Sequence, residues 1–132
     1  MTASGSVTIA SEEATLRARQ KAREVAENLG FRVTDVTRIV TAVSELARNV
    51  YLYAGEGEMR WREVRREGRS GVEFVFDDDG PGIGDVEAAL EGEYSTSNGM
   101  GRGLSGTRQL MDAMEIETSP EDGTTVRIVM WL

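Results

Sequence analysis

The sequence predicts an α+β sandwich in which helices cover one face of a sheet. Two helical patterns follow each other early in the chain, and paired strand patterns come after them. A further helix and two more strands follow a glycine-rich segment. Because the helices are grouped and do not alternate strictly with strands, this fold class is favoured. The 132 residues suffice for one core, and we expect a single domain over residues 1–132.

The first half of the chain contains the two grouped helices. A short strand is expected at residues 7–9, and Ser11 has the residue type of a helix N-cap. That helix is expected to end at Gly30, the residue type that commonly ends helices. Thr34 or Asp35 is expected to cap the second helix. Apolar residues of this second helix recur at spacings of three and four, namely Val36, Ile39, Val40, Val43, Leu46, Ala47, Val50 and Ala54.

The second half is expected to form most of the sheet. Strand patterns at 58–66 and 72–77 flank a short turn. A helix is expected at 104–114, followed by strands at 115–118 and 124–131. In the last of these, apolar residues alternate with other residues, as expected for a strand with one buried face.

Composition excludes several classes of chemistry. The chain has no histidine and no cysteine, which excludes catalytic triads, cysteine nucleophiles, phosphohistidine relays, disulfides and thiolate or imidazole zinc sites. The formal net charge of −8 argues against a nucleic-acid partner. Lys21 is the only lysine and lies far from any glycine loop, which excludes a P-loop. With neither a signal-peptide pattern nor a membrane-spanning apolar stretch, we expect a cytoplasmic protein without membrane contact.

Glu45 and Asn49 form the first candidate constellation. They lie four residues apart on the second predicted helix, about 40° apart around its axis and away from the apolar stripe. A carboxylate can accept a proton from a hydroxyl group, and an amide oxygen is a suitable Mg²⁺ ligand. The alternative is an ordinary solvated helix face.

Asp78, Gly80 and Gly82 form the pattern D-x-G-x-G directly after a predicted strand. The glycines would let backbone lie against a flat ring. The carboxylate could accept the amino group of adenine and would disfavour the carbonyl that guanine presents there. The alternative is an acidic turn, for which aspartate, glycine and proline are standard residues.

Two further segments could contact a nucleotide. Eight of the 15 glycines lie between residues 80 and 106, and the segment 98–106 runs into a predicted helix, an arrangement that binds phosphate well. Arg102 adds a positive charge there, although the segment could also be a plain flexible loop. Gly123 and Thr124 begin the last strand, where the alternative is an ordinary hairpin turn.

The order of these four segments resembles the Bergerat-type ATP-binding fold of the GHKL superfamily. The resemblance covers nearly the whole chain and implies an ATP-binding α/β sandwich with a mixed sheet and helices on one face. Within the superfamily, "SELARNVYLYAGEG", "YSTSNGMGRGL" and the final "VMWL" resemble the RsbT-type switch serine/threonine kinases of bacterial stressosomes.

This resemblance implies a role for each candidate residue and ATP with Mg²⁺ as cofactors. Glu45 would polarise the attacking hydroxyl, Asn49 would hold Mg²⁺, and Asp78 would recognise adenine. The other expected ATP contacts are Gly80, Gly82 and Thr124 near adenine, with Gly99, Gly101, Arg102 and Gly103 over the phosphates. Arg102 departs from the small residue that the resemblance leads us to expect within the lid.

The resemblance also implies partners. The substrates would be STAS-domain scaffold and antagonist proteins, and the released kinase would activate a metal-dependent serine phosphatase through its regulatory domain. One alternative is an anti-sigma factor that binds a sigma factor and phosphorylates its anti-anti-sigma antagonist. Another is a binding module that uses ATP only to change shape. The hairpin arginines Arg60, Arg62, Arg65, Arg66 and Arg69 indicate either a solvated hairpin or a docking edge for an acidic partner.

Overall fold

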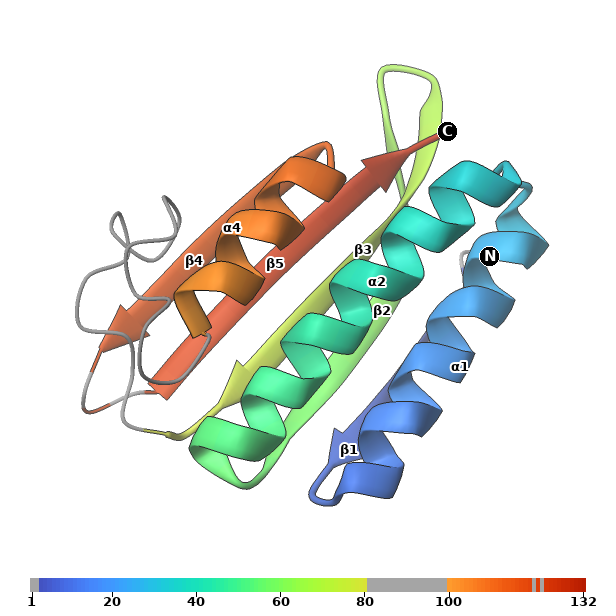
Figure 1. The fold of residues 1–132 in the computed structure, drawn as a ribbon. Coiled ribbons are helices and arrows are strands. Elements are labelled where there is room, and N and C mark those ends of the chain that lie inside the picture. Colours follow the sequence, from blue (N-terminus) through green and yellow to red (C-terminus); the bar gives the residue numbers. More distant parts are fainter. Residues whose placement is uncertain (1–2, 81–99, 120, 122) are drawn as a thin grey trace.

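Helices cover one face of the sheet, as Figure 1 shows for the part of the chain that is described. The computed structural model describes residues 3–80, 100–119, 121 and 123–132. In chain order the elements are β1 (Ser4–Ile9), α1 (Glu12–Leu29), α2 (Val33–Asn49), the π-helix η1 (Val50–Ala54), β2 (Gly57–Arg66), β3 (Arg69–Asp78), α4 (Met100–Leu110), β4 (Ala113–Ser119) and β5 (Gly123–Trp131). The predicted α+β sandwich with helices on one face is confirmed.

The sheet has the strand order β1-β2-β3-β5-β4, and each of these four neighbouring pairs is antiparallel. The expectation of a mixed sheet is therefore wrong for the described strands. The crossover through α4 does bring β4 into the same direction as β3. However, β5 turns back after β4 and pairs between them, so the two strands of equal direction are not neighbours.

Helix α1 begins and ends where the sequence predicts. The Ser11 Oγ accepts a hydrogen bond of 3.1 Å from the backbone N–H of Ala14, as an N-cap residue should. Gly30 has φ +92°, and its N–H donates to the carbonyl of Glu27. Glycine adopts this left-handed conformation without steric cost, so the chain can turn at once towards α2.

Helix α2 departs from the prediction at both ends. It begins at Val33, and the residue in the N-cap position is Arg32, whose side chain makes no capping hydrogen bond. The expected cap residues Thr34 and Asp35 therefore lie within its first turn. The α-helix stops at Asn49 and continues as the π-helix η1. A periodic apolar pattern does not reveal this change because the buried stripe runs through both helices.

The core lies between the helices and the sheet. Alternate residues of β3 and β5 face the helices and are buried there, including Phe74, Phe76 and Ile128. Leu46 of α2 and Leu104 of α4 pack into the same cluster. Burying such side chains contributes about 1.5–3 kcal/mol each, which holds the layer of helices against the sheet.

Helix α4 starts and ends earlier than residues 104–114. It begins at Met100 and ends at Leu110, and β4 begins at Ala113. Pairing with β5 explains the early end. Asp112 donates its N–H to the carbonyl of Val129 at 3.1 Å, and its carboxylate accepts the N–H of Trp131 at 2.7 Å. These bonds draw the following residues into the sheet.

Across the described ranges, no helix is long and apolar enough to cross a membrane.

Candidate functional site

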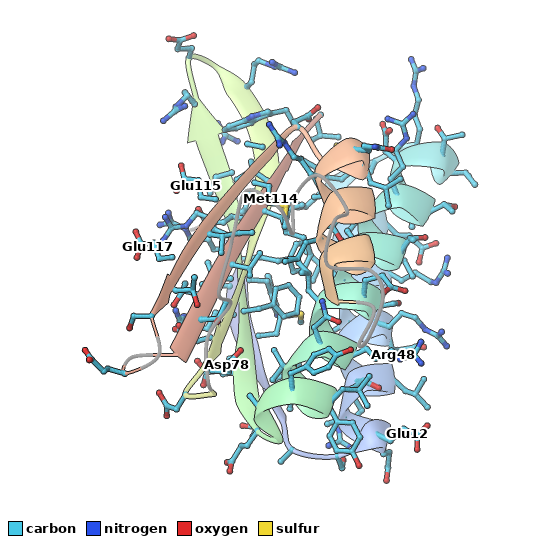
Figure 2. The ribbon with its side chains drawn as sticks, turned by 60° about the vertical axis from the view of Figure 1, so that its left-hand side comes forward. Glu12, Arg48, Asp78, Met114, Glu115 and Glu117 are labelled. Carbon is cyan, nitrogen blue, oxygen red and sulfur yellow. The ribbon has the colours of Figure 1, made fainter. Side chains whose placement is uncertain are left out.

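The ends of three strands meet at Asp78. It is the last residue of β3, and it pairs with Gly57 of β2 on one side and Thr124 of β5 on the other. Figure 2 shows Asp78 at this end of the sheet. Its Oδ1 accepts a 2.9 Å hydrogen bond from the N–H of Gly80, which fixes the turn out of the strand. The carboxylate is therefore held in place at the strand end.

The electrostatic setting of Asp78 differs from that of its neighbour Asp77. Burial raises the pKa of Asp78, and the charges of Asp77 and Asp79 raise it further, against the opposing effect of nearby N–H groups. Burial also opposes ionisation of Asp77, but hydrogen bonds from Thr125 and Arg60 lower its pKa below the ordinary value. The Arg60 Nη2 lies 2.7 Å from the Asp77 carboxylate. The negative charge of Asp77 is thus neutralised by the guanidinium of Arg60.

Asp78 has no cationic partner within the described ranges of the chain. A half-buried carboxylate with raised pKa is a strong hydrogen-bond acceptor that still lacks a donor of matching strength. It can therefore accept a hydrogen bond from an amino group of a bound ligand.

Three glycines let backbone approach Asp78 closely. A Cβ at Gly123 would lie 1.9 Å from the Asp78 carbonyl oxygen, and a Cβ at Gly57 would lie 2.5 Å from the Asp77 carbonyl oxygen. A Cβ at Gly80 would lie 2.8 Å from the Cβ of Ala54. Gly80 was a predicted site residue. Spacing does not predict Gly57 as a site residue, and it indicates Gly123 only together with Thr124, because the closeness of both glycines to Asp78 depends on strand register.

Gly123→Ala should lower the free energy of unfolding. Gly123 has φ +80°, which costs a residue with a Cβ about 1–2 kcal/mol, and the carbonyl contact adds a steric clash. Urea denaturation measures the loss. Gly68→Ala is the matched control, because Gly68 has φ +81° and open space around its Cβ position. If both variants lost the same free energy of unfolding, the close approach of Gly123 to Asp78 would contribute nothing to stability.

Asn49 and Glu45 lie one turn apart at the end of α2, and both are half-buried. The Nδ2 of Asn49 is buried and has no hydrogen-bond partner in the described part of the protein. The next residue, Val50, reaches Gly57, where its Cγ1 lies 2.6 Å from the position a Cβ would take. This contact ties the end of α2 to the strand ends beside Asp78. The pair is thus not a fully solvated helix face.

Helix α4 packs against α2, and its N-terminal end points towards the end of the sheet that holds Asp78 (Figure 1). Gly101 and Gly103 lie in its first turns and not in a loop. Gly82 and Gly99 lie outside the described residues, and so does the side chain of Arg102. Helix N-termini attract anions, so the N-terminal end of α4 is suited to a phosphate.

Thr124 is buried at 8% exposure, and its Oγ1 lies 2.9 Å from the Oγ1 of Thr118. Thr124 pairs with Asp78 across the sheet, and its backbone N–H donates a hydrogen bond to that carboxylate.

A hollow of about 720 Å³ opens beside Asp78, a volume in the range of small-ligand pockets. Its walls include Ala54, Gly57 and Asp78. Further acidic side chains line it, with Arg60 as the basic residue. Such walls disfavour a polyphosphate in this hollow.

Comparisons with known proteins agree with this arrangement. A family model described as the histidine kinase-like ATPase domain matches residues 9–130. The serine/threonine-protein kinase RsbT of Bacillus subtilis is 43% identical over 126 residues, which cover 96% of this chain and 95% of RsbT. The anti-sigma F factor of the same species is 31% identical over 104 residues, 74% of this chain and 70% of that protein.

Solved structures share the fold at low identity. The RsbU and RsbW domains of a Mycobacterium tuberculosis protein match with a TM-score of 0.63 and 17% identity, covering 98% of this chain and 32% of theirs. The mycobacterial sensor histidine kinase MprB matches with a TM-score of 0.57 and 18% identity, and the match covers 98% of this chain and 97% of the MprB chain. From the family match and the 43% identity it follows that the chain belongs to the histidine kinase-like ATPases and, within them, to the serine/threonine kinases related to RsbT.

Proposed function

We propose that the protein transfers the γ-phosphoryl group of ATP to a serine or threonine hydroxyl of a STAS-domain scaffold or antagonist protein. The observation that carries this proposal is the half-buried carboxylate of Asp78 at the strand ends, which has no cationic partner among the described residues, in a chain 43% identical to RsbT. The site belongs to one ATPase domain spanning residues 1–132, in a cytoplasmic protein.

Asp78 accepts the amino group of adenine in this proposal. Gly80 and Gly82 leave room for the flat base, and Thr124 supports the carboxylate from the neighbouring strand. Guanine presents a carbonyl in place of the amino group, so two hydrogen-bond acceptors, this carbonyl and the Asp78 carboxylate, would face each other. Nucleotide binding is therefore selective for adenine.

Asn49 is the proposed Mg²⁺ ligand. An amide can offer its oxygen to the cation and its N–H group to a phosphate oxygen, and the Nδ2 of Asn49 is buried without a partner among described residues. Within those residues no cluster of three or more acidic side chains could hold a metal alone, so the remaining ligands would be phosphate oxygens and water. When bound, Mg²⁺ offsets negative charge on the phosphates.

Glu45 orients the attacking hydroxyl and accepts its proton. The hydroxyl oxygen then bonds to the γ-phosphorus, the bond to the β,γ-bridging oxygen breaks, and ADP leaves. The N–H groups around Gly99, Gly101 and Gly103 contact the phosphates, and Arg102 supplies a positive charge at the same segment. In a chain with one distant lysine, these groups carry the stabilisation that a P-loop lysine gives elsewhere.

The partner class is tested by incubating the protein with radiolabelled ATP, Mg²⁺ and one candidate partner at a time. We expect label on a STAS-domain protein, and binding without label to the regulatory domain of a serine phosphatase. The alternative is an anti-sigma factor kinase, which the 31% identity to an anti-sigma F factor favours. Stable binding to a sigma factor would support that alternative and overturn the switch-kinase proposal.

Asn49→Asp should make ATP binding depend more steeply on Mg²⁺ concentration. A carboxylate can still hold the cation, but it adds charge beside the phosphates when the cation is absent. Calorimetry with ATP at low and high Mg²⁺ measures the effect. We expect a clear loss of affinity at low Mg²⁺ and partial recovery at high Mg²⁺. The same affinity as wild type at both concentrations would remove Asn49 from the site.

A further inference from the structure

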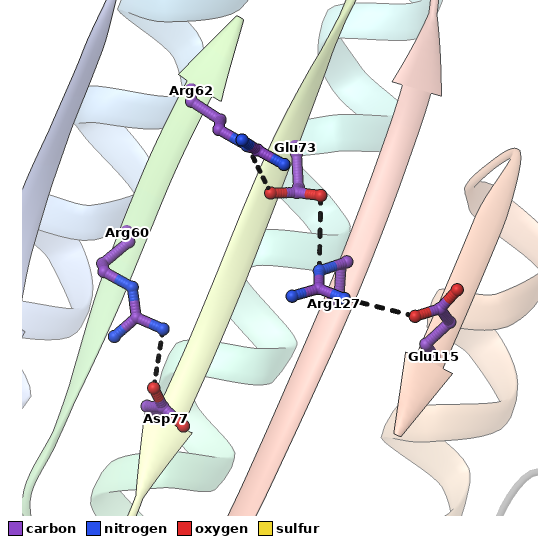
Figure 3. Close-up of polar contacts among 6 residues, drawn as sticks. All are labelled: Arg60, Arg62, Glu73, Asp77, Glu115 and Arg127. Carbon is purple, nitrogen blue, oxygen red and sulfur yellow. Dashed lines mark hydrogen bonds and ion pairs between the residues drawn. The ribbon is translucent and has the colours of Figure 1, made fainter. Parts of the chain in front are cut away.

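The face of the sheet that points away from the helices carries a chain of ion pairs across four strands (Figure 3). Arg62 of β2 lies 2.8 Å from Glu73 of β3, Arg127 of β5 lies 3.3 Å from the same carboxylate, and Arg127 also lies 3.3 Å from Glu115 of β4. The side chain of Glu73 is only 10% exposed. Glu73 and Glu115 are therefore already paired with arginines.

The structure separates four of the five hairpin arginines into two groups. Arg60 and Arg62 are held by carboxylates of the same sheet. Arg65 and Arg66, near the tip of the β2–β3 hairpin, are exposed and have no ion pair with any described residue. The second pair leaves two unmatched positive charges at the end of the sheet far from Asp78.

A hollow of about 310 Å³ lies beside these two arginines, and we name it the hairpin hollow. Val64, Val129 and Trp131 give it an apolar lining. Trp131 lies over Gly71, where a Cβ would come within 2.7 Å of the indole ring, so the missing side chain makes room for the ring. The guanidinium of Arg69 lies 5.9 Å from the centre of that ring and helps to hold it.

The hairpin hollow is positive in a protein of net charge −8. Its charged lining consists of Arg62, Arg65, Arg66 and Arg127 against Glu73 and Glu115. Both glutamates are paired with arginines of the same lining, so the positive excess comes from Arg65 and Arg66. An apolar lining with a positive rim complements a carboxylate next to a large apolar side chain.

We propose that the hairpin hollow docks an acidic segment of a partner protein, with an apolar side chain against Trp131 and carboxylates on Arg65 and Arg66. An extended nucleic acid fits less well, because it would reach beyond the hollow to Glu117, which faces the same side of the sheet as Glu115 (Figure 2) and has no ion pair with a described residue. The hollow lies at the opposite end of β3 from Asp78, so docking leaves the nucleotide site open. This proposal is independent of the proposed function.

The test uses the full chain, isotope-labelled for NMR, and a synthetic peptide with glutamates on both sides of a central phenylalanine. We expect the peptide to shift the indole N–H of Trp131 and the amides of Val64 and Val129. The charge-reversed variant Arg65→Glu/Arg66→Glu should bind the peptide about tenfold or more weakly. Its affinity for ATP should equal that of wild type, which also shows that it is folded.

The matched control is Arg19→Glu/Arg23→Glu, which makes the same charge change at exposed positions of α1. It should bind the peptide as wild type does. If both variants bound the peptide equally weakly, the effect would be one of net charge, and the proposal would be wrong. The proposal would also be wrong if the peptide did not bind at all, or if it shifted only signals of residues on the helix side. Tighter binding of a single-stranded DNA of equal charge would show that the partner class is wrong.

Discussion

Glu45→Ala should abolish phosphoryl transfer to the partner protein while ATP still binds. Removing a general base typically lowers a rate by about 10²–10⁴-fold, because the hydroxyl is then neither oriented nor relieved of its proton. Glu45 lies one turn from Asn49 at the end of α2 and is half-buried, so truncation leaves the adenine end of the site unchanged. Single-turnover transfer assays and ATP calorimetry separate the two effects.

Glu27→Ala is the matched control for Glu45→Ala. Glu27 is an exposed glutamate of the helical layer on α1, and its loss should leave transfer at the wild-type rate. Glu45→Gln keeps the size of the side chain and should be nearly as inactive as the alanine variant. Transfer by Glu45→Ala at the wild-type rate would mean that another group serves as the base.

Asp78→Asn should weaken ATP binding by about 1.5–3 kcal/mol, because a charged hydrogen bond is lost and an amide donor faces the amino group. Asp77→Asn is the matched control, since the Asp77 carboxylate is directed to Arg60 and Thr125. It should leave ATP affinity close to that of wild type. Calorimetry with both variants decides the matter, and equal ATP affinity in wild type and Asp78→Asn would reject Asp78 as the adenine acceptor.

The same two variants should change stability in opposite directions at neutral pH. The raised pKa of Asp78 means that its ionisation costs native-state stability as pH rises through the carboxyl range, so ligand-free Asp78→Asn should be more stable. The lowered pKa of Asp77 means that its ionised form stabilises the native state above that range, so Asp77→Asn should be less stable.

Urea denaturation across pH tests these signs. Both differences should shrink as pH falls below the carboxyl range, where the wild-type groups are protonated in both states. A destabilised Asp78→Asn at neutral pH would show that the burial of this carboxylate is fully compensated in the ligand-free protein.

Local chemistry explains which parts of the fold were predictable. Ser11 and Gly30 act within a few residues of themselves, so their residue types predicted both ends of α1 correctly. The end of α4 depends instead on Asp112, whose bonds to β5 come from residues far along the chain. The prediction of a mixed sheet was wrong for a similar reason. The position of β5 beside β3 depends on pairing between residues far apart in the sequence.

The residues of the candidate site likewise differ in whether local sequence or long-range pairing determines their position. Asp78 followed by Gly80 is a local pattern, and the structure adds that this carboxylate is half-buried and has no cationic partner in the described part of the chain. Gly57 and Gly123 matter because register brings them against the end of β3. The difference between Arg62, which is paired, and Arg65, which has no ion pair with a described residue, likewise depends on cross-strand neighbours. Spacing therefore predicts site residues on one segment better than those assembled from several.

The most direct measurement of the central claim is the fate of the γ-phosphoryl group in a single turnover. Wild-type protein is mixed with radiolabelled ATP, Mg²⁺ and a STAS-domain partner, quenched in acid and separated by mass. The account predicts acid-stable label on a serine or threonine of the partner, no label on the kinase itself, and no transfer by Glu45→Ala. Label released only as inorganic phosphate, or retained on this chain, would contradict it.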